Sequence, residues 1–158
     1  MVATLVAGPA AALSCLPANP LVAWHVLADE GTPFTVIHGT LDFDPGALPR
    51  PVEDGSLRQQ VTPVTTRLSG FALTADGFTR PYAGEVTLAV QCNGPWCGSA
   101  VPGEPVLAFV TTADRTIPVD PCNTALMRHP APEALELMRS CAATASVGGT
   151  CDRPVLRP

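Results

Sequence analysis

The sequence predicts a mainly β protein, a small barrel of five to six short strands with a short helix before it and another helix after it. Three observations lead to this prediction. The chain has 158 residues, which fits one domain. Hydrophobic residues make up 46% and charged residues 15%, enough apolar material for a single core. The 18 prolines and 13 glycines separate short β-branched runs, which favours strands and turns over long helices.

The charge balance argues against one class of partner. The formal net charge is −5, and the chain has nine basic residues, all of them arginine. Proteins that bind a phosphate backbone carry clustered cations on one face. We therefore expect no nucleic acid among the partners.

Residues 1–12 are apolar and rich in small side chains, and Ala10-Ala11-Ala12 fits an Ala-x-Ala cleavage site. We interpret this segment as signal-peptide-like, although it lacks a positively charged start; an ordinary N-terminal strand is the alternative. The run is too short to span a bilayer, so we expect no integral membrane segment. This interpretation predicts a periplasmic or secreted protein, with one domain over residues 13–151 and a frayed tail over 152–158.

The first predicted element is a short helix over residues 20–29. Leu21, Trp24 and Leu27 recur at helical spacing, which places Trp24 on the buried face. His25 lies next to that face and is expected at its rim. A second helix, of about three turns, is predicted from Pro132 onward by the spacing of Leu135, Met138 and Cys141.

Residues 34–43 alternate apolar and polar side chains and form the clearest strand. Gly39 falls on its core face, where a missing side chain permits a sharp bend or a close backbone approach. His38 is on the other face and is expected to be solvated. Residues 44–60 are rich in proline and glycine and predict a loop. Further strands are predicted over 61–73, 78–82, 86–92, 106–110 and 117–119. The first has a bulge or bend at Gly70, and Pro81 makes 78–82 an edge strand. The continuous apolar run 106–110 predicts a central strand buried on both sides.

Six cysteines and a signal-like start indicate an oxidising compartment, in which thiols pair. The spacing and the expected fold favour the pairs Cys92–Cys97, Cys141–Cys151 and Cys15–Cys122. An alternative is a zinc site drawn from Cys92, Cys97, Cys122 and His129, but the chain has no Cys-x-x-Cys pair. We expect neither a metal nor a cofactor. Acylation of Cys15, a further alternative, would leave one of the other cysteines without a partner.

Trp96 lies between the two cysteines of the connection Cys92 to Gly98. A tryptophan on a constrained loop is a candidate binding anchor. The alternative is that its ring packs over the disulfide and plugs one end of the barrel, since large aromatic side chains are mostly packing groups.

The sequence offers little support for an enzyme. Its three histidines are isolated from one another, and it has no Gly-x-Ser-x-Gly elbow, phosphate-binding glycine loop or His-Glu-x-x-His motif. Asp42 and Asp44 share one strand face, but they border a loop and are better explained as solvated surface charges. We therefore expect a protein that is not an enzyme. A cryptic hydrolase is kept as a third hypothesis, after the two non-enzymatic ones given below.

Several motifs occur in a recognisable order. Leu13-Ser14-Cys15 follows the signal-like segment, and Phe34 to Leu41 is similar to the first barrel strand of netrin-like modules. Gly103 to Phe109 then fits the pattern Gly-x-x-x-Leu-x-Phe, and a later strand ends near Cys122. This order resembles the netrin and tissue-inhibitor-of-metalloproteinase superfamily. The resemblance implies an OB-type five-stranded barrel with flanking helices.

Two short runs give a closer resemblance. Gly77 to Pro81 and Gly94 to Gly98 resemble secreted proteins of alphaproteobacteria over residues 13–151, a likeness that implies no activity.

The inhibitory members of the superfamily chelate a protease zinc through the amine and carbonyl of a mature N-terminal cysteine. In this sequence the expected cut leaves Leu13-Ser14 ahead of Cys15, and a Cys-x-Cys start is absent. Our first hypothesis is therefore a non-enzymatic, disulfide-stabilised periplasmic or secreted binding module. Its partner is an unknown protein or small ligand, which we expect to bind at the barrel end that carries Trp96 and the 44–60 loop. A netrin-like metalloprotease inhibitor is the alternative.

Overall fold

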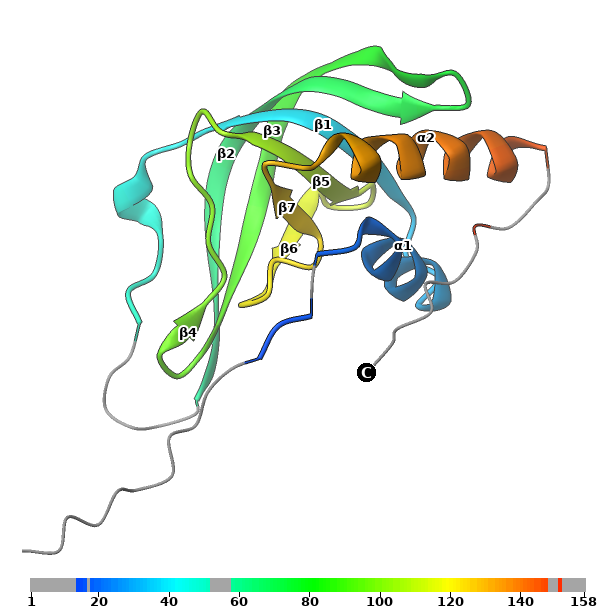
Figure 1. Ribbon diagram of the computed structural model, residues 1–158. Helices are drawn as coiled ribbons and strands as arrows, with labels where there is room; N and C mark the ends of the chain where they lie inside the picture. The colour runs from blue at the N-terminus through cyan, green and yellow to red at the C-terminus, as the bar shows by residue number, and fades with distance from the viewer. Residues whose placement is uncertain (1–13, 17, 52–57, 148–150, 152–158) are drawn as a thin grey trace, which may run out of the picture.

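A computed structural model describes residues 14–16, 18–51, 58–147 and 151 (Figure 1). The signal-like segment 1–12, the tail 152–158 and part of the predicted 44–60 loop lie outside these residues. The elements in chain order are α1 (Pro20–Asp29), β1 (Phe34–Asp42), the 3-10 turn η1 (Pro45–Ala47), β2 (Gln59–Thr74), β3 (Gly77–Asn93), β4 (Trp96–Cys97), β5 (Pro105–Thr111), β6 (Thr116–Val119), β7 (Leu126–Arg128) and α2 (Pro132–Ser146).

The strands form one sheet in the order β4-β3-β2-β1-β5-β7, and β6 pairs with β3. All pairs are antiparallel except β3 with β6, and the sheet curls into a half-barrel (Figure 1). The mainly β class and the two flanking helices are therefore confirmed. The expected number of strands, five to six, is too low, since the described residues contain seven.

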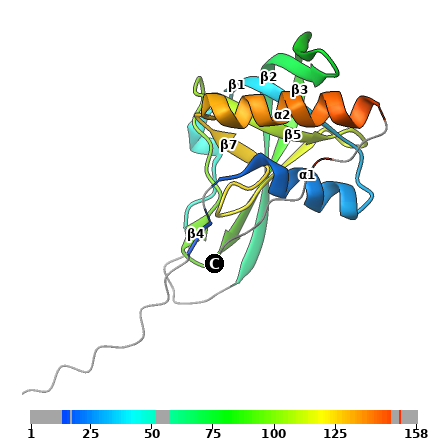
Figure 2. The ribbon, with the colours of Figure 1, turned by 45° about the vertical axis from the view of Figure 1, so that its right-hand side comes forward.

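Hydrophobic side chains fill both faces of the sheet. One buried cluster lies on one face and includes Ile37, Leu68 and Leu88. A second cluster joins the other face to the helices and includes Leu27 of α1, Phe109 of β5 and Met138 of α2. Figure 2 shows both helices on the same side of the sheet. The two clusters explain why β5 is a continuous apolar run, as predicted for a strand buried on both sides.

The helices begin where the sequence predicts them. Asn19 caps α1, because its side-chain oxygen accepts a hydrogen bond from the backbone N–H of Leu21 at 3.0 Å. Pro132 occupies the first turn of α2, which runs for 15 residues and is longer than the three turns expected. Met138 and Cys141 are its buried residues, so the predicted buried face of this helix is confirmed.

The largest departure from prediction is β3. The expected short strand 78–82 and the strand 86–92 form one strand of 17 residues. Pro81 is tolerated within it because, among the described residues, this half of β3 pairs only with β2, so the missing N–H breaks no ladder. The expectation that Pro81 marks a sheet edge therefore holds, and the expectation of a separate strand is wrong.

Gly39 of β1 lies directly opposite Gly70 of β2. A Cβ atom built on Gly39 would overlap the carbonyl oxygen of Ser69, and one on Gly70 would overlap that of His38. The predicted close backbone approach at Gly39 is confirmed. For Gly70 the sequence predicts a bulge or a bend; the pairing with β3 is regular at Gly70, and the shift in register lies between Ala72 and Leu73.

His38 is only partly exposed, whereas the sequence predicts a solvated side chain. Its ring lies 5.7 Å from that of Phe78 in an edge-on arrangement, on the face of the sheet that α2 covers. The guanidinium of Arg139 lies 5.6 Å from the centre of the same phenylalanine ring. The physical reason is that both faces of β1 carry buried clusters, so the side facing away from the first cluster is also partly shielded from water.

Candidate binding surface at the β3–β4 hairpin

The candidate site that the sequence predicts is the hairpin that joins β3 to β4. Cys92 lies opposite Cys97, and Asn93 lies opposite Trp96. The disulfide Cys92–Cys97 closes this hairpin across a Cα–Cα distance of 4.0 Å. The covalent link holds Trp96 close to the end of the sheet and limits the number of conformations that the hairpin can adopt.

The backbone on either side of Trp96 is fixed by further contacts. The N–H of Gly94 donates a hydrogen bond to the carbonyl of Arg58 at 3.2 Å, and the N–H of Gly98 donates to the carbonyl of Gln91 at 2.8 Å. Gly98 also lies against the end of β6, where a Cβ atom would overlap the carbonyl oxygen of Val119. The hairpin is therefore tied to the sheet by a disulfide, hydrogen bonds and close packing.

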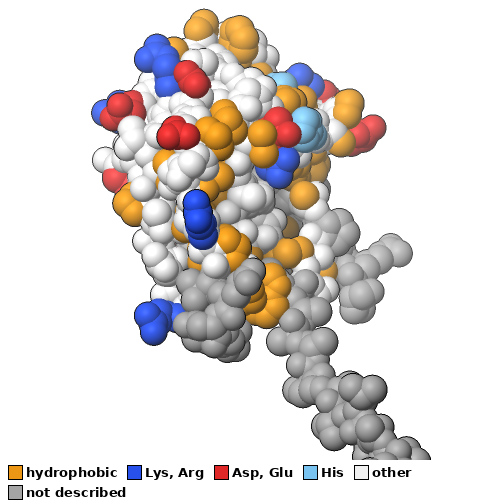
Figure 3. All heavy atoms as spheres, turned by 90° about the vertical axis from the view of Figure 1, so that its left-hand side faces the viewer, with side chains coloured by type: hydrophobic (Ala, Val, Ile, Leu, Met, Phe, Trp, Pro, Cys, Tyr) orange, Lys and Arg blue, Asp and Glu red, His pale blue; other side chains and the backbone are white. Residues whose placement is uncertain are grey.

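Trp96 itself is half-buried and belongs to neither hydrophobic cluster of the described residues. Cys92 beneath it is buried, at 2% exposure. On the face drawn in Figure 3, the acidic side chains lie in the upper half, while the described part of the lower half, where Figure 1 places β4, shows hydrophobic and basic side chains. This end of the molecule thus combines an aromatic side chain on a closed hairpin with hydrophobic and basic neighbours on that face, among them the exposed Arg58.

The three disulfides are Cys15–Cys122, Cys92–Cys97 and Cys141–Cys151, the pairs that the sequence favours. None of the six cysteines has a free thiol. The alternative zinc site is therefore wrong as drawn, because Cys92, Cys97 and Cys122 are all in disulfides. Within the described parts of the chain, no group of three or more His, Cys, Asp or Glu residues lies close enough to hold a metal ion.

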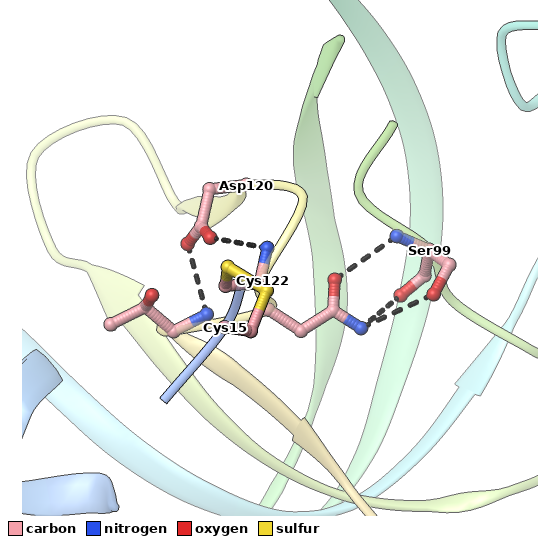
Figure 4. The surroundings of a disulfide bond; sticks show 6 residues. Cys15, Ser99, Asp120 and Cys122 are labelled. Atoms are coloured by element: carbon pink, nitrogen blue, oxygen red, sulfur yellow. Dashed lines mark hydrogen bonds between the residues drawn. A yellow bond between two sulfur atoms is a disulfide. The ribbon is translucent and has the colours of Figure 1, made fainter. Parts of the chain in front are cut away.

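The Cys15–Cys122 disulfide fastens the start of the described chain to the turn after β6 (Figure 4). Asp120 shapes this turn, since its carboxylate accepts hydrogen bonds from the backbone N–H of Cys122 at 2.8 Å and of Thr124 at 2.9 Å. Asn123 has a φ of 53° and clamps the turn to Ser99 with its side-chain amide. With its sulfur in this bond, Cys15 offers no thiol for acylation.

Sequence reasoning did not single out Asp120 and Asn123. A signal was present, because Asp and Asn on either side of Pro121-Cys122 are typical of a turn in which side chains bond to nearby backbone groups. The turn matters because it carries Cys122, which is bonded to Cys15. Local sequence patterns do not show which distant cysteines pair, so they do not show that this turn is important.

Titratable groups outside the hairpin form structural contacts. The carboxylate of Glu104, before β5, accepts a hydrogen bond from Arg128 Nε at 2.8 Å and lies 3.2 Å from Nε2 of His129. Hydrogen bonding to Arg128 lowers the pKa of Glu104 most, and His129 lowers it further. Burial, followed by the charge of Arg139, lowers the pKa of His38.

These contacts do not form a catalytic arrangement. His38 lies beside an aromatic ring and a guanidinium, and His129 lies beside a carboxylate that is already paired. Asp42 and Asp44 are exposed, and Asp44 caps η1 by accepting the backbone N–H of Gly46 at 2.9 Å. The contacts described for these groups place no nucleophile beside a base.

Helices α1 and α2 are both too short to cross a bilayer, and the described residues contain no other α-helix. Comparisons of the chain with protein-family models, with curated proteins and with solved structures find no match. The arguments for function therefore come from the chain's own residues.

Proposed function

We propose that this chain is a non-enzymatic, disulfide-stabilised binding module of an oxidising compartment, periplasmic or secreted. Its partner is a protein or small ligand that meets the β3–β4 hairpin. The three disulfides support the compartment, because disulfides persist where thiols are oxidised and are rare in the cytosol.

One observation carries the binding role. Trp96 stands half-buried on a hairpin closed by a disulfide, and it packs into neither hydrophobic cluster of the described chain. An aromatic ring held in one place binds with little loss of conformational freedom, and tryptophan is enriched among residues that dominate binding energy. A packing role would place the ring in one of the clusters.

The strand pairing supports an OB-type barrel as the scaffold. Strands β1, β2 and β3 follow one another as neighbours, β1 also pairs with β5, and β3 pairs in parallel with β6. In this proposal, the closing strand of the barrel is divided into β6, which pairs with β3, and β7, which pairs with β5. Barrels of this type bind ligands through the face of their second and third strands and through the loops beside it.

The test uses the full-length exported chain and the variant Trp96→Ala. We expect the variant to lose capture of its partner from the extracytoplasmic fraction of the producing cell. Its melting temperature should fall by no more than about 1–2 °C, the range for a surface substitution in a chain of this size.

Phe71→Ala is the matched control, since Phe71 is an aromatic residue of β2 that is 50% exposed and lies far along the sheet from Trp96. Equal capture by wild type and Trp96→Ala would refute the role of Trp96. A large fall in melting temperature would support the packing interpretation instead.

A second candidate function is the netrin-like metalloprotease inhibitor. Its supporting observation is that Cys15 is exposed and fixed to the barrel by its disulfide with Cys122. A mature chain that begins at Cys15 would hold its free amine at a defined place on the surface. N-terminal sequencing of the exported protein decides between a start at Leu13, which excludes this mechanism, and a start at Cys15, which calls for inhibition assays against a metalloprotease.

A further inference from the structure

A hollow of about 270 Å³ lies where α1, β1, β2, β3 and α2 meet. Its lining includes Trp24 of α1, Phe34 of β1, Leu73 of β2, Arg80 of β3 and Ala142 of α2. The volume is just below the usual range for small-molecule sites, so that the hollow fits a ligand of one aromatic ring with a short side chain.

The aromatic wall of the hollow is built in advance. The rings of Trp24 and Phe34 meet edge to face with centres 5.1 Å apart. Phe34 in turn packs on the buried ring of Phe109 at 5.7 Å. Both outer rings are half-buried, so each leaves part of its surface open. A flat apolar group placed there would contact rings that need no rearrangement.

Arg80 gives the hollow its charge. Among the described residues, its guanidinium has no hydrogen bond, ion pair or cation–π partner, and no acidic side chain shares the lining with it. A guanidinium matches the geometry of a carboxylate, because it donates two parallel hydrogen bonds to it. Next to the apolar wall, the pairing would be less screened than on open surface.

We propose that this hollow binds a small aromatic monocarboxylate, with its ring against Trp24 and Phe34 and its carboxylate paired with Arg80. A single cation in a molecule of net charge −5 suits a monoanion better than a phosphate or a polyanion. The site is separate from the hairpin of Trp96: β2 pairs with β3 from Gln59 opposite Asn93 to Thr74 opposite Gly77, and the two sites occupy opposite ends of that ribbon.

The test is a titration of the ¹⁵N-labelled full chain with phenylacetate, followed by two-dimensional NMR. The two tryptophans, Trp24 and Trp96, supply separate indole N–H signals. We expect a saturable shift of the Trp24 signal and no shift of the Trp96 signal. Phenylacetamide, which has the same shape without the charge, should bind at least about tenfold more weakly.

Two variants separate the two parts of the proposal. Arg80→Gln should weaken phenylacetate binding by at least about tenfold, and its spectrum should otherwise match the wild type because Arg80 is exposed. Ala142→Phe should block binding by filling the hollow while Arg80 stays. Arg67→Gln is the matched control: it removes the same charge from an exposed position of β2, outside the lining of the hollow, and should bind phenylacetate as the wild type does.

Several results would overturn the proposal: a Trp24 signal that does not move, equal binding of the acid and the amide, or full affinity in Arg80→Gln. A shift of the Trp96 signal alone would also overturn it and would place the ligand at the hairpin. Because the readout is the Trp24 signal, the outcome does not depend on whether Trp96 binds a partner.

Discussion

At the scale of single residues, Gly39 and Gly70 decide how closely β1 and β2 approach. A Cβ atom on Gly39 would overlap the backbone of Ser69, which is part of the sheet and cannot move aside as a flexible side chain can. We expect Gly39→Ala to lower the free energy of unfolding by about 3 kcal/mol or more. Chemical denaturation of the oxidised protein measures this loss.

The matched control is Gly84→Ala in β3. At Gly84 the nearest atom to an added Cβ is the Tyr82 hydroxyl oxygen at 3.4 Å, which is ordinary contact. This variant should unfold close to the wild type. Similar losses for both variants would show that glycine flexibility in strands, rather than the β1–β2 contact, explains the effect.

His38 provides a prediction about pH. Its pKa is lowered by burial and by the charge of Arg139, so the unfolded chain binds a proton on this residue before the folded chain does. The stability that His38 contributes is complete above the unfolded pKa, about 6.5, and falls as the pH drops through the lower folded pKa. Since the ring is partly exposed, we expect a loss below about 1 kcal/mol.

Melting temperatures of the wild type and His38→Gln at pH 7.5 and pH 5.5 check this sign. The wild type should lose more stability on acidification than the variant does. Glu104 and Asp114 have lowered pKa values and protonate in a more acidic range, so they leave this comparison unaffected. Parallel losses in the two proteins would assign the pH response to other groups.

At the scale of elements, local patterns predict both helices and most strands. The spacing of apolar residues and the proline at Pro132 are local signals, and they place α1 and α2 correctly at their starts. The cap at Asn19 is also local, although the prediction did not use it. The strand β7 was missed because it has only three residues and owes its place to β5. Its backbone pairs with β5, and Arg128 at its end bonds to Glu104.

The join of two expected strands into β3 shows another limit of local patterns. Pro81 and Gly84 read as interruptions in the sequence. In the sheet the same stretch continues without a break, because β2 runs opposite it over almost its whole length. Which side of a strand is free is a tertiary property, and it decides whether a proline interrupts the strand.

The two proposed sites differ in how far local sequence patterns can predict them. The Trp96 hairpin is contained in seven consecutive residues, so its closure by Cys92 and Cys97 is visible in the sequence. The hollow at Arg80 draws on α1, β1, β2, β3 and α2. No local pattern joins Trp24 to Arg80, and only the fold brings the two together.

At the scale of the whole molecule, the disulfides close loops of very different lengths. Cys15 and Cys122 are separated by 107 positions, Cys141 and Cys151 by 10, and Cys92 and Cys97 by 5. A cross-link that closes a longer loop removes more entropy from the unfolded chain. Replacing each pair with serine should therefore cost about 4–5, about 3 and about 2 kcal/mol, respectively.

Urea unfolding of the three double variants, each with its other disulfides oxidised, measures these losses. The expected order follows the loop lengths. A largest loss at Cys92–Cys97 would show that contacts around the hairpin, rather than chain entropy, determine what its disulfide contributes.

The 107 positions between Cys15 and Cys122 also contain other cysteines with which Cys15 could pair. Cys92 and Cys97 both lie nearer to Cys15 along the chain than Cys122 does. A short loop closes with a smaller loss of entropy than a long one, so we expect Cys92 and Cys97 to pair with each other more readily than either pairs with Cys15. The hairpin disulfide therefore removes two competitors for the long-range bond.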